Sequence, residues 1–467
     1  MRRRDFLQIA GIGGVFGLGA EMALAAGSPI ISPGCRGTKV RVGKAYLGVP
    51  RAHWPTPLLD LEEEVSRYEG EFRRLSKELA DVEFVGNVLI TSQEGARRFR
   101  ESIGDVDGIL LIHLSMGIWN MLLEILAARK PTVLFAAPYS GHEWTGFGSL
   151  RKQKEGSLLE CILTSDLDQL SAAIRPFRAI HHLREAKILN VTTNDFSSFA
   201  GMMKEKFGTE IIKISRDRVL EAYNSIPDGD AREEARRWIE GAEKVVEPSE
   251  DEIFRSCKLA LALQKIADEE NAVMVTVDCY GSMWRQLPAY PCISHARMNS
   301  IGLGGMCESD LRAAMTQLII QGLSGRPGFC NDPTMDLSRN AIILAHCMGT
   351  PKMDGPEGKA APYRLRSVME RQEGATPQVF MDVGRKTTSA ILANQNLIHY
   401  FTGEIIEAPD LPRGCRTKIV VRVDGDAERL WQNWSHGLHR VTCYGDISKD
   451  LERFCRFNSV QLVNEAT

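Results

Sequence analysis

Short apolar runs alternate with amphipathic stretches at the start of the chain. The apolar runs are bounded by Gly, Asp or Pro and span residues 39–48, 82–91, 107–115 and 131–139. The stretch 58–80 between the first two runs repeats Leu, Val, Tyr and Phe at helical spacing. Apolar strands that alternate with helices predict a parallel sheet covered on both faces. We therefore expect a first α/β domain over residues 39–180.

The same alternation begins again after Ala186. Apolar runs at 186–193, 208–215 and 271–279 enclose two helical stretches, 230–246 and 251–270. This pattern predicts a second α/β domain over residues 183–345.

Beyond residue 350 the pattern changes to short apolar runs separated by Gly, Pro and Asp turns, with no long amphipathic stretch between them. Such a pattern predicts a mostly β region over 350–467, a barrel or a sandwich. The predicted fold class is α/β, with two doubly wound parallel-sheet domains followed by a mostly β C-terminal domain.

The first residues have the organisation of an export signal. Arg2, Arg3 and Arg4 precede an apolar, glycine-rich stretch that ends in the small-residue site Ala23-Leu24-Ala25. The Arg pair followed by Asp-Phe-Leu fits the twin-arginine type of signal. We expect cleavage of residues 1–25, a periplasmic or extracellular location, and no membrane span after cleavage. An uncleaved membrane anchor is the alternative, but the apolar run is shorter than the ~20 residues that a span needs.

Charge and cysteine content exclude some classes of protein. The net charge is −3, which gives no electrostatic footprint for nucleic acid, so no nucleic-acid partner is expected. Eleven cysteines occur without a C-x-x-C pair or repeating spacings. Reduced, buried cysteines are therefore expected rather than a disulfide framework.

Two carboxylates flank a predicted helix. Between Glu308 and Asp332 the apolar residues follow the spacing of a helix that is buried on one face, at Leu311, Ala314, Met315, Leu318 and Ile319. Ser309 or Asp310 can cap its start, and Glu308 lies at the positive end of the helix dipole. Asp332 is expected in a turn before Pro333. A buried strand follows and ends at His346, and ligand sites in α/β sheets collect beyond such ends.

A third segment adds an imidazole. His439 precedes a predicted strand over Val441 and Cys443. Two carboxylates and an imidazole suit a hard or borderline divalent ion with open coordination positions. A zinc site from His436, His439 and Cys443 is a weaker alternative, because a second ligand pair is missing. Taken singly, Glu308 can also be a helix-cap acid and Asp332 a turn former.

These residues resemble the L-fucose/L-arabinose ketol-isomerase superfamily, whose members have two α/β domains and a C-terminal β domain. Glu308 and Asp332 resemble its two acids in type and spacing, and His439 in "GLHRVTCYGD" resembles its distant histidine. "AHCMGTPKM" with His346 and "SMGIWNMLLE" with Trp119 resemble segments that contact substrate. The resemblance covers most of residues 39–447.

The resemblance implies a function and a set of roles. Glu308 and Asp332 would be both acid/base pair and metal ligands, and His439 would complete a site for a divalent metal, Mn²⁺ first. His346 would bind a sugar hydroxyl or be an adjoining metal ligand, and Trp119 would contact the sugar. It also implies an aldose–ketose isomerase that forms a closed homo-oligomer, a trimer or a hexamer. The export signal and Leu438, where the family has a polar residue, depart from the family pattern. An exported sugar-binding protein and a catalytically degenerate isomerase homologue therefore remain alternatives.

Overall fold

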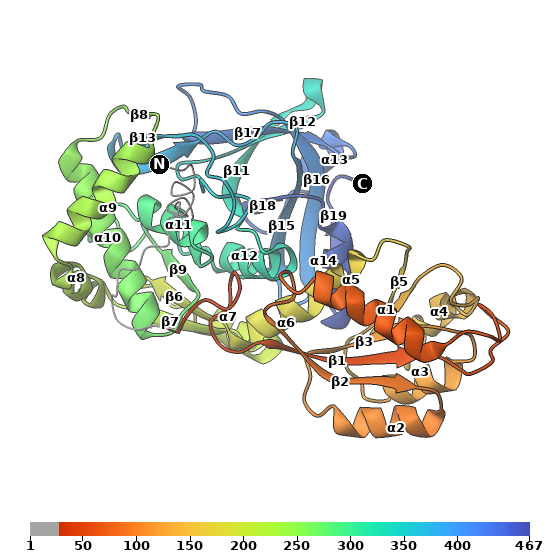
Figure 1. Ribbon diagram of the computed structural model, residues 1–467. Helices are drawn as coiled ribbons and strands as arrows, with labels where there is room; N and C mark the ends of the chain where they lie inside the picture. The colour runs from red at the N-terminus through yellow and green to blue at the C-terminus, as the bar shows by residue number, and fades with distance from the viewer. Residues whose placement is uncertain (1–27) are drawn as a thin grey trace, which may run out of the picture.

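The computed structural model describes residues 28–467. The predicted signal over residues 1–25 lies outside this range. Within residues 28–467, none of the helices combines the length and the apolar character needed to cross a membrane. The chain forms two parallel sheets followed by a mostly β region (Figure 1), so the predicted fold class is confirmed.

The first domain is a five-stranded parallel sheet in the order β2-β1-β3-β4-β5, the order of flavodoxin-like doubly wound folds. Its strands are β1 (Val40–Leu47), β2 (Val82–Ile90), β3 (Gly108–His113), β4 (Thr132–Ala136) and β5 (Leu159–Leu163). Its helices are α1 (Leu61–Arg74), α2 (Gln93–Ser102), α3 (Trp119–Leu126), α4 (Trp144–Leu150) and α5 (Gln169–Ala172).

Strand alternation in this sheet produces two separate cores. Leu110 and Ile112 of β3 join the core under α1, whereas Ile109 and Leu111 join the core under α2 and α3. Successive side chains of a strand point to opposite faces, so an unbroken apolar run covers both. This explains why β3 has no polar positions before His113.

The second domain is a four-stranded parallel sheet in the order β10-β9-β6-β7. Its strands are β6 (Lys187–Val191), β7 (Glu210–Ile214), β9 (Met274–Val277) and β10 (Gly304–Cys307). Its helices are α6 (Arg175–Glu185), α7 (Ser197–Phe207), α8 (Arg216–Ser225), α9 (Asp228–Gly241), α10 (Glu250–Glu269) and α11 (Cys292–Ser300). Helix α10 begins with a complete capping box between Ser249 and Glu252.

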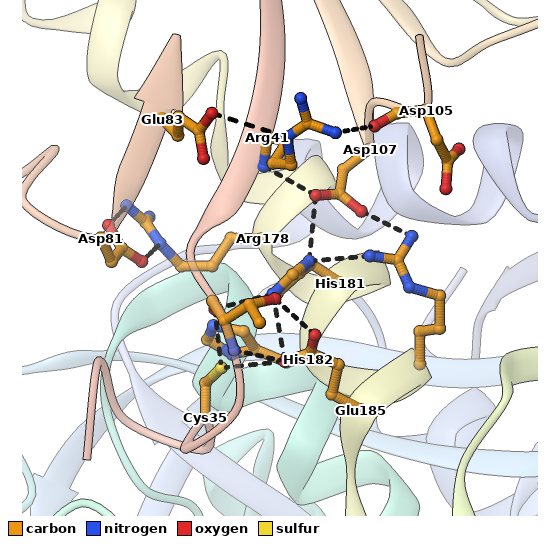
Figure 2. A network of polar contacts seen from close by, with 12 residues as sticks. Cys35, Arg41, Asp81, Glu83, Asp105, Asp107, Arg178, His181, His182 and Glu185 are labelled. Atoms are coloured by element: carbon orange, nitrogen blue, oxygen red, sulfur yellow. Dashed lines mark hydrogen bonds and ion pairs between the residues drawn. The ribbon is translucent and has the colours of Figure 1, made fainter. Parts of the chain in front are cut away.

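Ion pairs join α6 to the first domain (Figure 2). The Nε of Arg178 donates to Asp81 at 2.6 Å, and the Nδ1 of His181 donates to Asp107 at 2.9 Å. The Nε2 of His181 donates to the Thr38 carbonyl oxygen at 2.9 Å. Both ring nitrogens therefore lie beside acceptors, which favours the protonated imidazolium, although the Arg184 guanidinium also lies 3.0 Å from Nδ1. Burial alone would lower the pKa of His181, but the hydrogen bond and charge of Asp107 outweigh it and raise that pKa to about 10.

The C-terminal region contains a closed barrel. Strands follow the order β15-β18-β11-β12-β17-β16, and β16 pairs again with β15 to close the ring, with β19 beside β16. The strands are β11 (Phe329–Asp336), β12 (Ala341–His346), β15 (Lys386–Asn394), β16 (Leu397–Glu407), β17 (Thr417–Val423), β18 (Arg440–Tyr444) and β19 (Gln461–Asn464). A smaller sheet joins β8 (Lys244–Val245), β13 (Tyr363–Val368) and β14 (Glu373–Val379), and short helices are η1 (Leu337–Arg339), α13 (Ala427–Asn433) and α14 (Ser448–Phe457).

Strands β11 and β12 pair with this barrel, although they fall within the 183–345 segment. β12 was expected in a parallel sheet, and that expectation is wrong, because β12 is antiparallel to both β11 and β17. An apolar run alone does not distinguish a parallel strand from a barrel strand.

Helix α12 (Leu311–Ser324) lies between the second sheet and the barrel (Figure 1). It was expected to bury one face, but only Arg312 and Ser324 escape full burial. The side-chain N–H groups of its two buried glutamines have partners inside the protein, since Gln321 donates to the Leu303 carbonyl oxygen at 2.8 Å and Gln317 donates to Asn299 at 2.5 Å. Asp310 caps its start, and Gly325, at φ +68°, ends it in the left-handed conformation.

Candidate active site

Four of the five predicted site residues converge where the second sheet meets the barrel. Glu308 follows β10 directly, Asp332 lies in β11, His346 ends β12, and His439 immediately precedes β18. Strand register explains three of these placements. Asp332 lies opposite Ala345 of β12, the residue before His346. Asn331, the residue before Asp332, lies opposite Arg440 of β18, the residue after His439. The side chains next to these pairs are therefore neighbours at one end of the barrel.

The expected turn at Asp332 is wrong, because the residue lies within a strand. β11 pairs with β18 up to Asn331 and with β12 from Asp332 onward. Pro333 therefore has a neighbouring strand, β12, on one side only. Proline has no backbone N–H group to donate, and such an edge position tolerates it. A proline after an acid indicates a turn in most sequences, but here it marks the point where the pairing partner changes.

The distances among these side chains are those of one polar cluster. The Nε2 of His439 lies 3.3 Å from an Asp332 oxygen and 3.9 Å from a Glu308 oxygen. The Nε2 of His346 lies 3.8 Å from the other Glu308 oxygen, and the two imidazole ring centres are 5.6 Å apart. Both histidines are buried, whereas the two acids are about one third exposed. The cluster is therefore open to a ligand from the acid side.

Asp310 orients His439 and was not predicted for this role. One of its oxygens accepts from the Ala313 backbone N–H group at 2.9 Å and caps α12, and the other accepts from the Nδ1 of His439 at 2.9 Å. This contact fixes the proton on Nδ1 and directs Nε2 toward the two acids. Carboxylates that hold metal-binding histidines in this way are common. The sequence showed only the cap, because the contact with His439 spans more than a hundred residues.

The environments of the ionisable groups differ. Burial raises the pKa of Glu308 against the opposing charge of His439, and the nearby charge of Asp332 adds to the rise. Burial alone would lower the pKa of His439, but Asp310 and Asp332 outweigh it and raise that pKa to about 10. Burial lowers the pKa of His346 to about 4, so this histidine is neutral. The site thus combines an acid that holds its proton more tightly than usual with a neutral imidazole.

Unpaired atoms in the cluster fit a bound cation. One oxygen of Asp332 and Nε2 of His439 are buried without a hydrogen-bond partner among residues 28–467. Nε2 of His439 is close to Asp332, but the two groups are not aligned for a hydrogen bond. Buried polar atoms are nearly always satisfied, so such a group needs an explanation. Carboxylate oxygens and neutral imidazole nitrogens are the donors that Mn²⁺-like ions prefer.

Cysteines surround the same cluster. Ligand atoms of Cys330, His346 and His439 lie within 4.8 Å of one another, and so do those of Cys307, Glu308 and His346. Both thiols are buried, and the Cys307 thiol lies 3.8 Å from that of Cys279. Sequence reasoning assigned these cysteines only to the core.

Trp119 does not join the cluster within one chain. It begins α3 in the first domain, where its ring stacks on Phe147 with ring centres 6.3 Å apart. Figure 1 shows α3 and strands β11 and β12 in well-separated parts of the fold. Trp119 is 36% exposed, and Tyr139 and Trp144 of the same domain are more so.

The fold and the cluster are those of an α/β protein with a carboxylate–histidine site suited to a divalent cation. No family model matches the chain. The chain is 21% identical over 315 residues to a protein named sulfoquinovose isomerase from Alkalicoccus urumqiensis, covering 62% of this chain and 67% of that protein. It is 22% identical over 316 residues to a protein of the same name from Clostridium sp. (strain MSTE9), covering 61% and 66%. These similarities span about two thirds of each relative and support a place in a sugar isomerase superfamily.

Proposed function

We propose that the protein is a metal-dependent aldose–ketose isomerase that moves a proton between adjacent sugar carbons. The observation that carries the proposal is the convergence of Glu308, Asp332, His346 and His439, with an unpaired buried atom on both Asp332 and His439. The names of the relatives support the sugar isomerase class.

The chemistry assigns a role to each acid. Isomerisation removes a proton from the carbon next to a carbonyl group and returns it to the neighbouring carbon, which requires a base and an acid near the two carbons. Glu308 and Asp332 supply two carboxyl groups in different environments, and such pairs divide acid and base work. The raised pKa of Glu308 suits it to hold a proton and release it during the reaction.

A bound divalent cation, Mn²⁺ in our proposal, would stabilise the negative charge that develops on the sugar oxygens. Glu308, Asp332 and His439 would hold this ion. Asp310 keeps the imidazole of His439 in position, and His346 would bind a sugar hydroxyl group or serve as a further ligand. Ion binding competes with the proton on His439, so metal affinity should fall as the pH falls.

The exposed aromatic residues of the first domain support a proposal on assembly. Trp119 begins α3, which lies well apart from β11 and β12 in one chain (Figure 1), so we propose that it contacts the sugar in the site of another subunit of a closed homo-oligomer, a trimer or a hexamer. Light scattering tests this proposal, and a stable monomer at micromolar concentration would contradict it.

We also propose export by the twin-arginine route, which predicts that N-terminal sequencing of the exported protein starts near Ala26.

The proposed function is tested with a panel of sugars and metal-loaded protein. Sulfoquinovose heads the panel because the relatives carry its name, followed by aldoses and deoxy sugars. Turnover should require Mn²⁺ or a similar ion and should be lost in Glu308→Gln. Tight sugar binding without turnover in both proteins would instead favour the binding-protein or degenerate-homologue alternatives.

A further inference from the structure

Two cysteines and a glutamate meet beside the candidate active site, from three segments far apart in the sequence. Cys347 follows the last residue of β12, Cys415 lies two residues before β17, and Glu370 lies in the turn between β13 and β14. β12 and β17 are antiparallel, with His346 opposite Thr417. The residues just beyond these strand ends are therefore brought together by register.

The three side chains already contact one another. The Cys347 thiol donates to one Glu370 oxygen at 3.1 Å, and the Cys415 thiol donates to the other at 3.1 Å. The three ligand atoms lie within 4.8 Å of one another. Zinc ligands lie about 2.3 Å (sulfur) and about 2.0–2.2 Å (oxygen) from the ion, so donor atoms in a tetrahedral site are roughly 3–4 Å apart. The two sulfur–oxygen separations already lie in that range.

Neighbouring groups orient two of the three side chains. The Tyr280 hydroxyl donates to Glu370 at 2.9 Å and orients this carboxylate, and the Met369 backbone N–H group donates to the Cys347 sulfur at 3.4 Å. Outer contacts of this kind hold ligands for a metal. The buried Arg416 and Lys418 side chains add positive charge beside the cluster. Two thiolates and one carboxylate carry more negative charge than a divalent ion neutralises, and the nearby cationic side chains offset the excess negative charge.

We propose that Cys347, Cys415 and Glu370 bind Zn²⁺ in a second metal site, separate from the carboxylate–histidine cluster. Each thiol releases its proton to solvent as its zinc–sulfur bond forms, and water completes the tetrahedron. The partly exposed Cys415 and the exposed Glu370 give the ion a path from solvent. The proposal does not depend on the proposed isomerase function.

The other sulfur groups fit this role less well. Cys279 and Cys307 supply two sulfurs, but Cys307 adjoins Glu308 of the first cluster. Cys330 shares both of its neighbouring imidazoles with that cluster. The Cys347 site uses none of the first cluster's donors, although Cys347 follows His346 in the chain. A zinc ion here would fix the loop after β12 to the β13–β14 turn and thereby hold His346 in position.

Cobalt titration of metal-stripped protein tests the proposal, because Co²⁺ bound by thiolate gives a near-ultraviolet charge-transfer band. We expect two Co²⁺ ions per chain in the wild type. We expect one ion, with the thiolate band retained, in the Glu308→Gln/Asp332→Asn variant. Cys415→Ser should lose the band and one ion, while Cys330→Ser and Cys455→Ser should keep the band. A band that depends on Cys330 and not on Cys415, or no band at stoichiometric Co²⁺, would overturn the proposal.

A measurement on the unmodified protein guards against variants that do not fold. Zn²⁺ should slow alkylation of Cys347 and Cys415 by iodoacetamide at least tenfold, mapped by mass spectrometry. Alkylation of the partly exposed Cys161 should be unchanged and serves as the internal control. Equal alkylation of Cys415 with and without Zn²⁺, or isolation of Cys347 and Cys415 as a disulfide after purification under air, would refute the site.

Discussion

Replacing Asp310 with Asn separates its two roles. Asn is as good a helix cap as Asp, so the contact with the Ala313 N–H group and the fold should survive. The negative charge that holds the Nδ1 proton of His439 is lost. Removing an outer carboxylate of this kind typically lowers metal affinity or activity by about 10- to 100-fold, which is about 1.4–2.7 kcal/mol in binding free energy.

The assay is isothermal titration of metal-stripped protein with Mn²⁺, together with thermal unfolding. Asp426→Asn is a matched control, because Asp426 caps α13 through the Glu428 N–H group, with no histidine attached among the described residues. Asp310→Asn should weaken Mn²⁺ binding while the protein still unfolds cooperatively, and Asp426→Asn should leave Mn²⁺ binding unchanged. Asp310→Ala should also lose about 1 kcal/mol of stability through the missing cap. If Asp310→Asn binds Mn²⁺ as tightly as the wild type does, Asp310 does not position a metal ligand.

Three further predictions concern the acids, an ion pair and helix packing. Glu308→Gln should lower turnover by roughly 10²- to 10⁴-fold while circular dichroism stays unchanged; a drop of less than tenfold would remove Glu308 from proton transfer. His181 has a pKa of about 10 in the folded protein. Its protonated form therefore stabilises the fold fully below its unfolded pKa of about 6.5, and this stabilisation is lost as the pH rises toward 10. The free energy of unfolding in urea should show this loss in the wild type but not in His181→Gln. Gly322→Ala in α12 should destabilise the protein, because the new Cβ would lie 2.5 Å from the Ala179 Cα atom. Gly201→Ala in α7, where the Cβ would meet open space, should stabilise it by up to about 1 kcal/mol. Melting temperatures that shift in the same direction in both variants would contradict this packing.

Local patterns predicted the elements well, because each depends on neighbouring residues. The apolar runs that became β1, β3 and β4 are bounded by the same Gly, Asp and Pro residues that end the strands. The start of α12 was also predictable, since Asp310 is a local cap. Closure of the barrel was not, because it depends on the pairing of β18 with both β15 and β11, which lie far from it in the sequence.

The candidate site was predictable in its residue types but not in its geometry. Glu308, Asp332 and His439 were identified by their resemblance to a family and by their chemistry. The strand at Asp332 was missed because Pro333 normally indicates a turn, and a change of pairing partner leaves no local signal. The contacts of Asp310 with His439 and of Cys347 with Glu370 depend on chain segments that only the fold brings together.

Isomerisation in D₂O tests the proposed proton transfer most directly. Mn²⁺-loaded protein is incubated with sulfoquinovose and a broad aldose panel, and products are followed by NMR. We predict metal-dependent conversion of at least one sugar with deuterium at C1 or C2, and neither conversion nor labelling with Glu308→Gln. Conversion without label would exclude Glu308 and Asp332 as a solvent-exchanging acid/base pair. A folded, Mn²⁺-loaded protein that neither converts nor labels any sugar would contradict the isomerase function itself.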